Sequence, residues 1–155
     1  MRAGEVGIAV LLAGTASGGI EHTILHGVSV GRVKAWVSPE QVSGLTSAKV
    51  QAAAESSLNR GGVHLKPGAG ADLFIGATGI QGPSGDCVVY VDARLIEDAK
   101  LERNGLRVEA SSWSRGAVVS GRAGDCTEST VKATRDVVDD FVEHYHAMNP
   151  GHTAK

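Results

Sequence analysis

The stretch VVYVDARLIEDAKLERNGLRVEASSW, residues 88–113, predicts two antiparallel strands joined by a tight turn. Its first half alternates with period two, which is typical of a strand with one buried face. One parity holds Val89, Val91, Ala93 and Leu95, and the other holds Val88, Tyr90, Asp92 and Arg94. The pair Asn104-Gly105 favours a hairpin turn, because both residue types tolerate positive φ. Alternation resumes at Leu106, Val108 and Ala110, and Trp113 has the opposite parity.

Strands are also predicted before this stretch and after it. Residues 28–37 alternate, with Val33, Ala35 and Val37 on one side and Arg32, Lys34 and Trp36 on the other. Leu73, Ile75 and Ala77 alternate in the same way with Asp72, Phe74 and Thr78. We expect two shorter extended pieces at residues 63–65 and 117–119.

Two helices are predicted from capping and stop signals. The first is expected to begin at Ser38-Pro39-Glu40-Gln41, which combines a cap residue with proline at the first helical position, and to end at Gly61-Gly62. The second is expected to begin at Asp125, with Glu128 completing a capping box, and to end at Asn149-Pro150-Gly151. Its apolar stripe comprises Val131, Thr134, Val138, Phe141, Tyr145 and Met148.

The order strand, helix, three or four mostly antiparallel strands, helix predicts an α+β fold. We expect a two-layer sandwich, in which one sheet of four to five strands carries both helices on one face (β-α-β-β-β-α order). The domain is expected over residues 28–150, after an amino-terminal segment at residues 19–27 and before a tail at residues 151–155.

The glycine-rich segment GATGIQGPSGDC, residues 76–87, is interpreted as a turn between strands. A phosphate-binding loop needs a lysine and a hydroxyl residue after its glycines and must open a helix, whereas here Asp86 and a strand follow. We expect the first strand to end near Gly79 and the next to begin at Cys87. Gly76 is expected to mark a bulge or a close approach of backbone.

Composition and charge exclude some classes of partner. The formal charge of −2 and the 4% of aromatic residues argue against nucleic acid, which requires a basic surface or stacking platforms. No apolar stretch is long enough to span a bilayer. Residues 1–18 resemble a secretory signal peptide: Arg2 precedes the apolar residues 7–13, and small residues follow at 14–17. A buried amino-terminal strand or helix is the alternative.

Two cysteines, Cys87 and Cys126, are the whole cysteine content of the chain. In an exported protein they would most simply form one disulfide that ties the sheet to the last helix. The alternative is a reactive thiol at Cys126, because the amino terminus of a helix favours a thiolate.

Catalytic and metal sites find little support in the sequence. His22 and His26 are spaced for one face of a helix and are the weak candidates for a metal site, but surface histidines explain them better. The carboxylates Asp136, Asp139, Asp140 and Glu143 are interpreted as the solvated face of the last helix. No nucleophile motif is present, and no catalytic residue and no cofactor are predicted.

Aromatic and charged side chains share one strand parity. Trp36, Phe74, Tyr90 and Trp113 are expected on the same sheet face as Arg94 and Arg107. Surfaces that combine aromatic residues and arginine are typical of protein interfaces. The alternative is that residues 22–28 or 117–119 cover this face as a lid.

Several segments resemble a group of small uncharacterised bacterial envelope proteins. They are VYVDARL (residues 89–95), LERNG (101–105), ASSWSRG (110–116) and VVDDF (137–141), with Tyr145 and Asn149-Pro150 after them. The domain of that group is considered similar to the amino-terminal domain of TolB and to periplasmic activators of penicillin-binding proteins. The resemblance covers residues 28–150. This chain departs from the pattern at His146-Ala147-Met148 and in having two cysteines.

The resemblance implies a protein that works by binding other proteins. We expect an exported, periplasmic or extracellular, non-enzymatic accessory subunit whose partner is another envelope or membrane-associated protein. A small-ligand binder that uses the exposed sheet face is the alternative, and a thiol- or metal-dependent enzyme is the third hypothesis.

Overall fold

The computed structural model describes residues 24–38, 42–122 and 124–151. In chain order its elements are β1 (Val30–Val37), α1 (Ser47–Arg60), β2 (Ala71–Gln81), β3 (Cys87–Lys100), β4 (Arg107–Gly121) and α2 (Cys126–Met148). The predicted signal peptide, His22 and most of the amino-terminal segment 19–27 lie outside the described residues.

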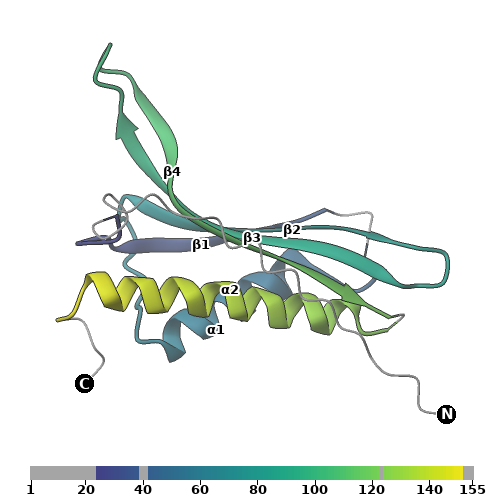
Figure 1. Cartoon of the computed structure of the whole chain (residues 1–155). Coiled ribbons are helices and arrows are strands. Elements are labelled where there is room, and N and C mark those ends of the chain that lie inside the picture. Colours follow the sequence, from purple (N-terminus) through teal and green to yellow (C-terminus); the bar gives the residue numbers. More distant parts are fainter. Residues whose placement is uncertain (1–23, 39–41, 123, 152–155) are drawn as a thin grey trace.

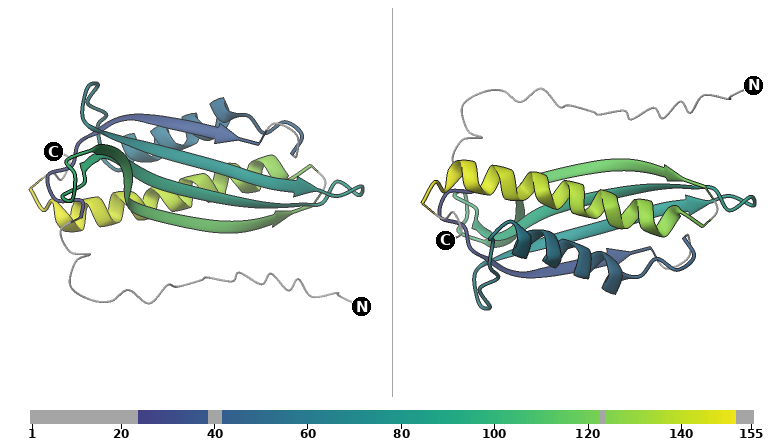
Figure 2. Two further views of the ribbon diagram at one scale, coloured as in Figure 1. Left: turned by 90° about the horizontal axis from the view of Figure 1, so that it is seen from above. Right: turned by 90° about the horizontal axis from the view of Figure 1, so that it is seen from below.

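The four strands form one sheet in the order β1-β2-β3-β4. β1 pairs parallel to β2, and the other two pairs are antiparallel. Both helices lie on one face of this sheet, and no helix of the described residues lies on the opposite face (Figures 1 and 2). The predicted α+β sandwich and its element order are therefore confirmed.

The core lies between the sheet and the two helices. The strands contribute the side chains on their helix-covered face, among them Leu73, Val89 and Leu95. Helix α2 contributes Val138 and Phe141, and all five side chains are fully buried. Burial of these apolar side chains is the main favourable term in folding, and it fixes which sheet face the helices cover.

A turn before β1 closes one end of this core. Leu25 is fully buried, and Asn149 after α2 holds the turn. The Asn149 side chain donates from Nδ2 to the Leu25 carbonyl at 2.7 Å and accepts at Oδ1 from the Gly27 amide at 2.8 Å. The turn at residues 24–27 thus belongs to the helix-covered side.

Helix α1 begins later than predicted. Thr46 is its cap, and Thr46 Oγ1 accepts a hydrogen bond from the Lys49 amide at 3.3 Å. The prediction of a start at Ser38 was wrong, because the Ser38 amide instead donates to the Ala77 carbonyl at 3.0 Å and continues the pairing of β1 with β2. Gly44 has a φ of +80°, which a continuous helix could not accommodate.

Four smaller predictions also need correction. Residues 63–65 form no strand, and residues 117–119 belong to β4 rather than to a separate piece. The capping box at Asp125 does not form: Asp125 has helical dihedral angles and its side chain makes no cap hydrogen bond. The glycine-rich turn occurs at residues 82–86 as expected, although β2 runs on to Gln81 rather than ending near Gly79.

Beyond residue 96, the β3–β4 hairpin bends away from the sheet on the side opposite the helices (Figure 1). We call residues 97–110 the arm. A register shift between Leu95 and Ile96 marks the start of the bend, and Ser112 is the extra residue on β4. Such a bulge increases local twist and bends the strand that carries it. None of the arm residues is buried.

Candidate interaction surface

The helix-free side of the sheet, which we call the open face, carries rows of side chains that cross neighbouring strands. The pairing aligns Lys34 with Phe74 and Arg94, and in the next row it aligns Trp36 with Gly76 and Asp92. A further row aligns Thr78 with Tyr90 and Val118.

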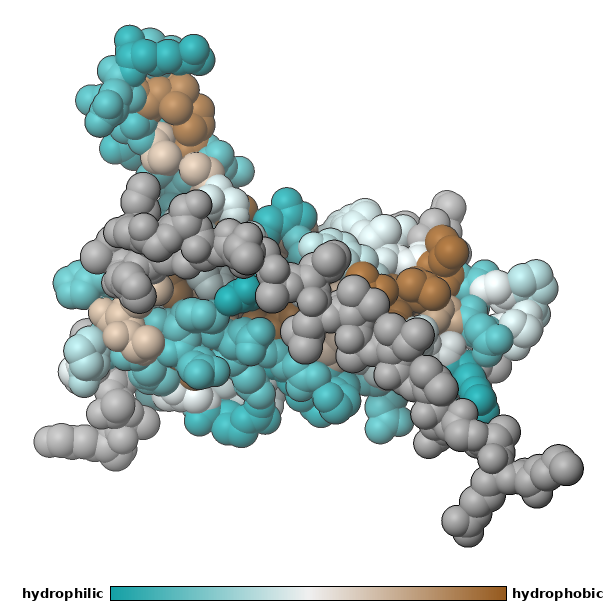
Figure 3. Space-filling model, in the orientation of Figure 1, coloured by the Kyte–Doolittle hydropathy of each residue, from teal (hydrophilic) through white to brown (hydrophobic). Residues whose placement is uncertain are grey.

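Large apolar side chains are exposed on this face. Trp36 and Tyr90 retain 48% and 47% of their accessible surface. The other members of the set are Ile80, Val88 and Val118. In Figure 3, hydrophobic surface is visible on the arm and at the far end of the sheet, among other places. Exposed apolar patches next to polar groups mark interaction surfaces on soluble proteins.

Arginine and aromatic groups meet at the centre of the open face. The Arg94 guanidinium lies over the Phe74 ring, 5.5 Å from its centroid, and is paired with the carboxylate of Asp92. The Asp92 side chain lies across Gly76, where a Cβ atom would come within 2.5 Å of Oδ1. Gly76 therefore permits the close approach of a side chain, and the predicted bulge or backbone approach at this residue is not observed.

A second glycine on this face accommodates the Tyr90 ring. A Cβ atom at Gly116 would lie 2.8 Å from Cε2 and Cζ of Tyr90, so the ring covers this glycine. The surface between the two strands is hollowed into a groove of about 340 Å³. The groove is lined by Tyr90, Asp92, Arg94, Ser114, Arg115 and Gly116.

A cluster of ion pairs lies where the arm leaves the sheet. Asp72 accepts from Arg32 Nε at 2.9 Å and from Lys34 Nζ at 2.6 Å. Partial burial raises the pKa of Asp72, but the hydrogen bonds and charges of Lys34 and Arg32 lower it more, so the pKa lies below its ordinary value of 3.8. The corner between arm and sheet encloses about 200 Å³, bordered in part by Asp72, Ile96, Glu97 and Glu109.

The structure divides the predicted interface residues into three groups. Trp36, Phe74, Tyr90 and Arg94 lie together on the open face, and Arg107 lies on the arm, 3.9 Å from Asp98. Trp113 does not join them. It pairs opposite the buried Leu95, and its ring packs edge-on against Phe141 of α2 at 5.1 Å between centroids.

The placement of Trp113 was wrong because alternation was counted through the bulge. The extra residue Ser112 shifts the strand by one position, which exchanges the two faces for every residue after it. Val118 is the residue that the sequence pattern did not reveal: beyond the bulge its parity places it on the open face, where it is 63% exposed.

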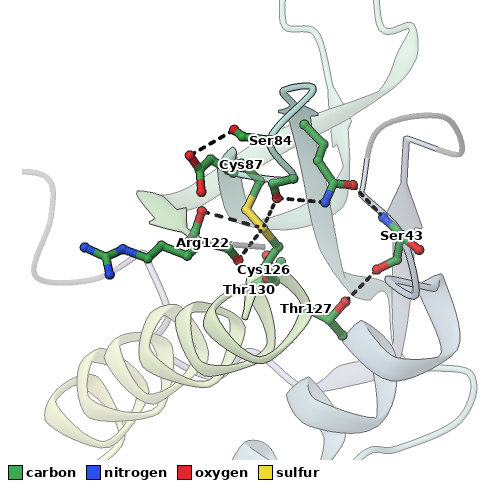
Figure 4. Close-up of a disulfide and its surroundings, with 11 residues drawn as sticks. Ser43, Ser84, Cys87, Arg122, Cys126, Thr127 and Thr130 are labelled. Atoms are coloured by element: carbon green, nitrogen blue, oxygen red, sulfur yellow. Dashed lines mark hydrogen bonds between the residues drawn. A yellow bond between two sulfur atoms is a disulfide. The ribbon is translucent and has the colours of Figure 1, made fainter. Parts of the chain in front are cut away.

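In their described parts, residues 24–28 and 117–119, neither proposed lid covers the open face. Residues 24–28 pack against the end of α2 through Asn149, and residues 117–119 lie within β4. Cys87 and Cys126 form a disulfide that joins the start of β3 to the first residue of α2, and the hypothesis of a free thiol at Cys126 is thereby contradicted (Figure 4).

Neither a metal site nor a membrane-spanning helix is found in the described ranges. They contain no group of three or more histidine, cysteine or carboxylate side chains placed to hold a metal ion. His26, the weak metal candidate that falls within them, is exposed. No helix in these ranges has the length and apolarity that crossing a membrane requires.

Comparison with known proteins finds distant structural similarity and shows no family. No family model matches the chain, and no curated protein matches its sequence. Similar solved structures include a dodecamer of a single-residue variant of PelC from Paraburkholderia phytofirmans, with 16% identity and a TM-score of 0.46 over 77% of this chain and 89% of that one. They also include a minor lipoprotein from Acinetobacter baumannii, with 12% identity and a TM-score of 0.37 over 83% of this chain and 98% of that one. The function of this chain must therefore be inferred from its own surface.

Proposed function

We propose that this chain is a non-enzymatic accessory subunit of a cell-envelope assembly, which binds another protein through the open face of its sheet. The observation that supports this function is the surface around Arg94. Exposed Trp36 and Tyr90 flank an arginine that stacks on Phe74, and these are the residue types enriched where proteins bind each other.

The disulfide supports the proposed location in the cell envelope. Disulfides form and persist in oxidising environments such as the periplasm and the extracellular space. The bond closes a separation of 39 residues between β3 and α2, and both sulfur-bearing residues are buried. A stable structural cross-link of this kind is expected of an exported protein.

The arm supports binding of a macromolecule rather than of a small solute. It rises on the same side as the open face (Figure 1), and the corner between arm and sheet is hollowed, so the two surfaces border an L-shaped recess. Leu106 on the arm is 59% exposed. A partner protein seated on the open face would contact both surfaces at once.

Site-specific photo-cross-linking in the native cell tests this function. A photoreactive phenylalanine analogue at Trp36 or Tyr90 is expected to capture a second protein. The same analogue at Ala52 of α1 or Asp140 of α2, both exposed on the helix side, is the matched control and should not capture it. Equal capture from both sides, or none from the open face, contradicts the proposal.

The groove beside Tyr90 favours a second candidate function, the binding of a small anionic ligand. Its volume of about 340 Å³ lies at the lower end of the range for ligand sites, and Arg94 and Ser114 offer hydrogen-bond donors. A thermal-shift screen against small carboxylic acids separates the two functions. A ligand binder should show a shift that Arg94→Gln abolishes, with no protein captured from Trp36.

A further inference from the structure

The two outer edges of the sheet differ in how well they are protected from pairing with another strand. β1 is short and carries Arg32 and Lys34, and natural proteins use short strands and such charges to block edge pairing. β4 is the longest strand among the described residues, and from Trp113 to Gly121 it pairs with β3 without a register shift. Arg115 is the only charged residue in that stretch.

The outer edge of β4 is unpaired in the part of the chain that the structure describes. Apolar side chains lie along this edge on both faces of the sheet. Val118 is exposed on the open face, and Trp113, Ala117 and Val119 are only partly buried on the helix side. A strand added at this edge would satisfy backbone hydrogen-bonding groups and cover apolar surface above and below the sheet.

β4 also carries a protruding side chain and a site that would receive it. Val118 protrudes from the open face by 63% of its accessible surface, and two residues away the Tyr90 ring lies over Gly116, which has no side chain to shield it. The midpoint between Val118 and Gly116 is Ala117. If two β4 strands pair antiparallel about Ala117, each Val118 lies opposite the other strand's Gly116 and contacts the Tyr90 ring beside it.

We infer that two copies of this chain associate through β4, antiparallel and centred on Ala117, to form one continuous eight-stranded sheet. The interface is isologous, because the same residues serve as protrusion and receiving site in both copies. The charges are compatible with this register. Each Arg115 lies opposite Val119 of the second copy, whereas pairing centred on Arg115 would place two arginines face to face.

This association does not depend on the proposed envelope partner. It would leave both open faces on the same side and place the two arms at opposite ends of the joined sheet. The recess on each copy would then become one half of a longer, two-fold symmetric platform.

The oligomeric state of the full chain tests the inference. Light scattering after size-exclusion chromatography is expected to give twice the chain mass of 15.9 kDa at micromolar concentrations. Val118→Lys should return the mass to that of a single chain, because it replaces apolar contact with two like charges, one from each copy, at diagonal positions about 7–8 Å apart. Ile80→Lys is the matched control: Ile80 is equally exposed, at 65%, but lies on β2, so this variant should stay dimeric. Circular dichroism checks that both variants are folded.

Cysteine cross-linking tests the register. Ala117→Cys should form a disulfide-linked dimer on a non-reducing gel, because each cysteine faces its own copy across the two-fold axis. Val119→Cys should not, because its neighbour is Arg115. A single-chain mass for the unmodified protein, assemblies larger than a dimer, a Val118→Lys dimer or equal cross-linking at both positions would each overturn the inference.

Discussion

Asp72 is the residue whose titration reports most directly on the ion-pair cluster below the arm. Its pKa is lowered in the folded chain, so Asp72 contributes stability above its unfolded pKa, and this contribution is lost as pH falls through the folded value. This stability is therefore lost below pH 3.8. We expect a carbon-detected NMR titration of the Asp72 carboxyl to give a midpoint below 3.8.

The variants Lys34→Met and Arg32→Met test the cause of the Asp72 shift. Each removes a hydrogen bond and a positive charge beside the carboxylate, so each should raise the midpoint towards 3.8, Lys34→Met more than Arg32→Met. A midpoint at or above 3.8 in the unmodified chain would show that these ion pairs do not lower the pKa of Asp72.

Gly61, the residue that follows α1, lies against Val142 of α2. A Cβ atom here would lie 2.9 Å from Cγ2 and 3.2 Å from Cβ of Val142, whose branched side chain cannot turn away freely. The φ of Gly61 is −79°, so backbone strain plays no part. We expect Gly61→Ala to lower the free energy of unfolding by about 1–3 kcal/mol, measured by urea denaturation.

Two further variants isolate that steric cause. Gly70→Ala, where no atom lies within 4 Å of the added methyl group, measures the backbone effect alone and should change stability little. In a double-mutant cycle, Val142→Ala should relieve much of the cost of Gly61→Ala. Additive losses would show that the contact with Val142 is not responsible.

The two helices differ in whether a side chain caps their first turn. Thr46 Oγ1 bonds to the Lys49 amide, whereas the Asp125 side chain makes no cap hydrogen bond. We expect Thr46→Ala to cost about 1 kcal/mol of stability, and Asp125→Ala to cost less because only a charge near the helix terminus is lost. Thermal unfolding of both variants decides the order, and a larger loss for Asp125→Ala would contradict it.

The strands of the central sheet could be predicted from the sequence because burial on one face imposes a period of two. Leu73, Ile75 and Ala77 are buried in alternation, as are Val89, Val91, Ala93 and Leu95. The start of α1 could not be predicted, because Ser38-Pro39 and Thr46-Ser47 are both plausible starts. The choice depends on Ser38 pairing with Ala77 of β2, a contact between residues far apart in the sequence.

The candidate surface could be predicted only up to the bulge. Trp36, Phe74, Tyr90 and Arg94 reach the open face because β1, β2 and the first part of β3 pair in register. Nothing in Ser111-Ser112 indicates which strand position is doubled, so Trp113 was assigned to the wrong face and Val118 was missed. The bulge depends on strand twist and on the packing of Trp113 against Phe141, which local sequence does not encode.

At the scale of the whole molecule, the arm and the two-layer body have separate roles. Among the described residues, the body contains every buried apolar side chain, while the arm contains none and packs against no helix (Figure 1). A two-stranded ribbon that leaves the sheet in this way adds little stability of its own. Its apolar surface is therefore expected to serve binding rather than folding.

Removal of the arm separates these two roles. Glu97 pairs directly opposite Ala110, so an Asn-Gly turn that joins Glu97 to Ala110 closes the hairpin without changing the register below it. We expect the shortened chain to unfold within a few degrees of the full chain, because no core contact is lost. It should nevertheless lose most of the photo-cross-linking from Trp36, because the partner no longer contacts both walls of the recess. A large drop in unfolding temperature would show that the arm supports the core, and unchanged cross-linking would show that the open face binds its partner alone.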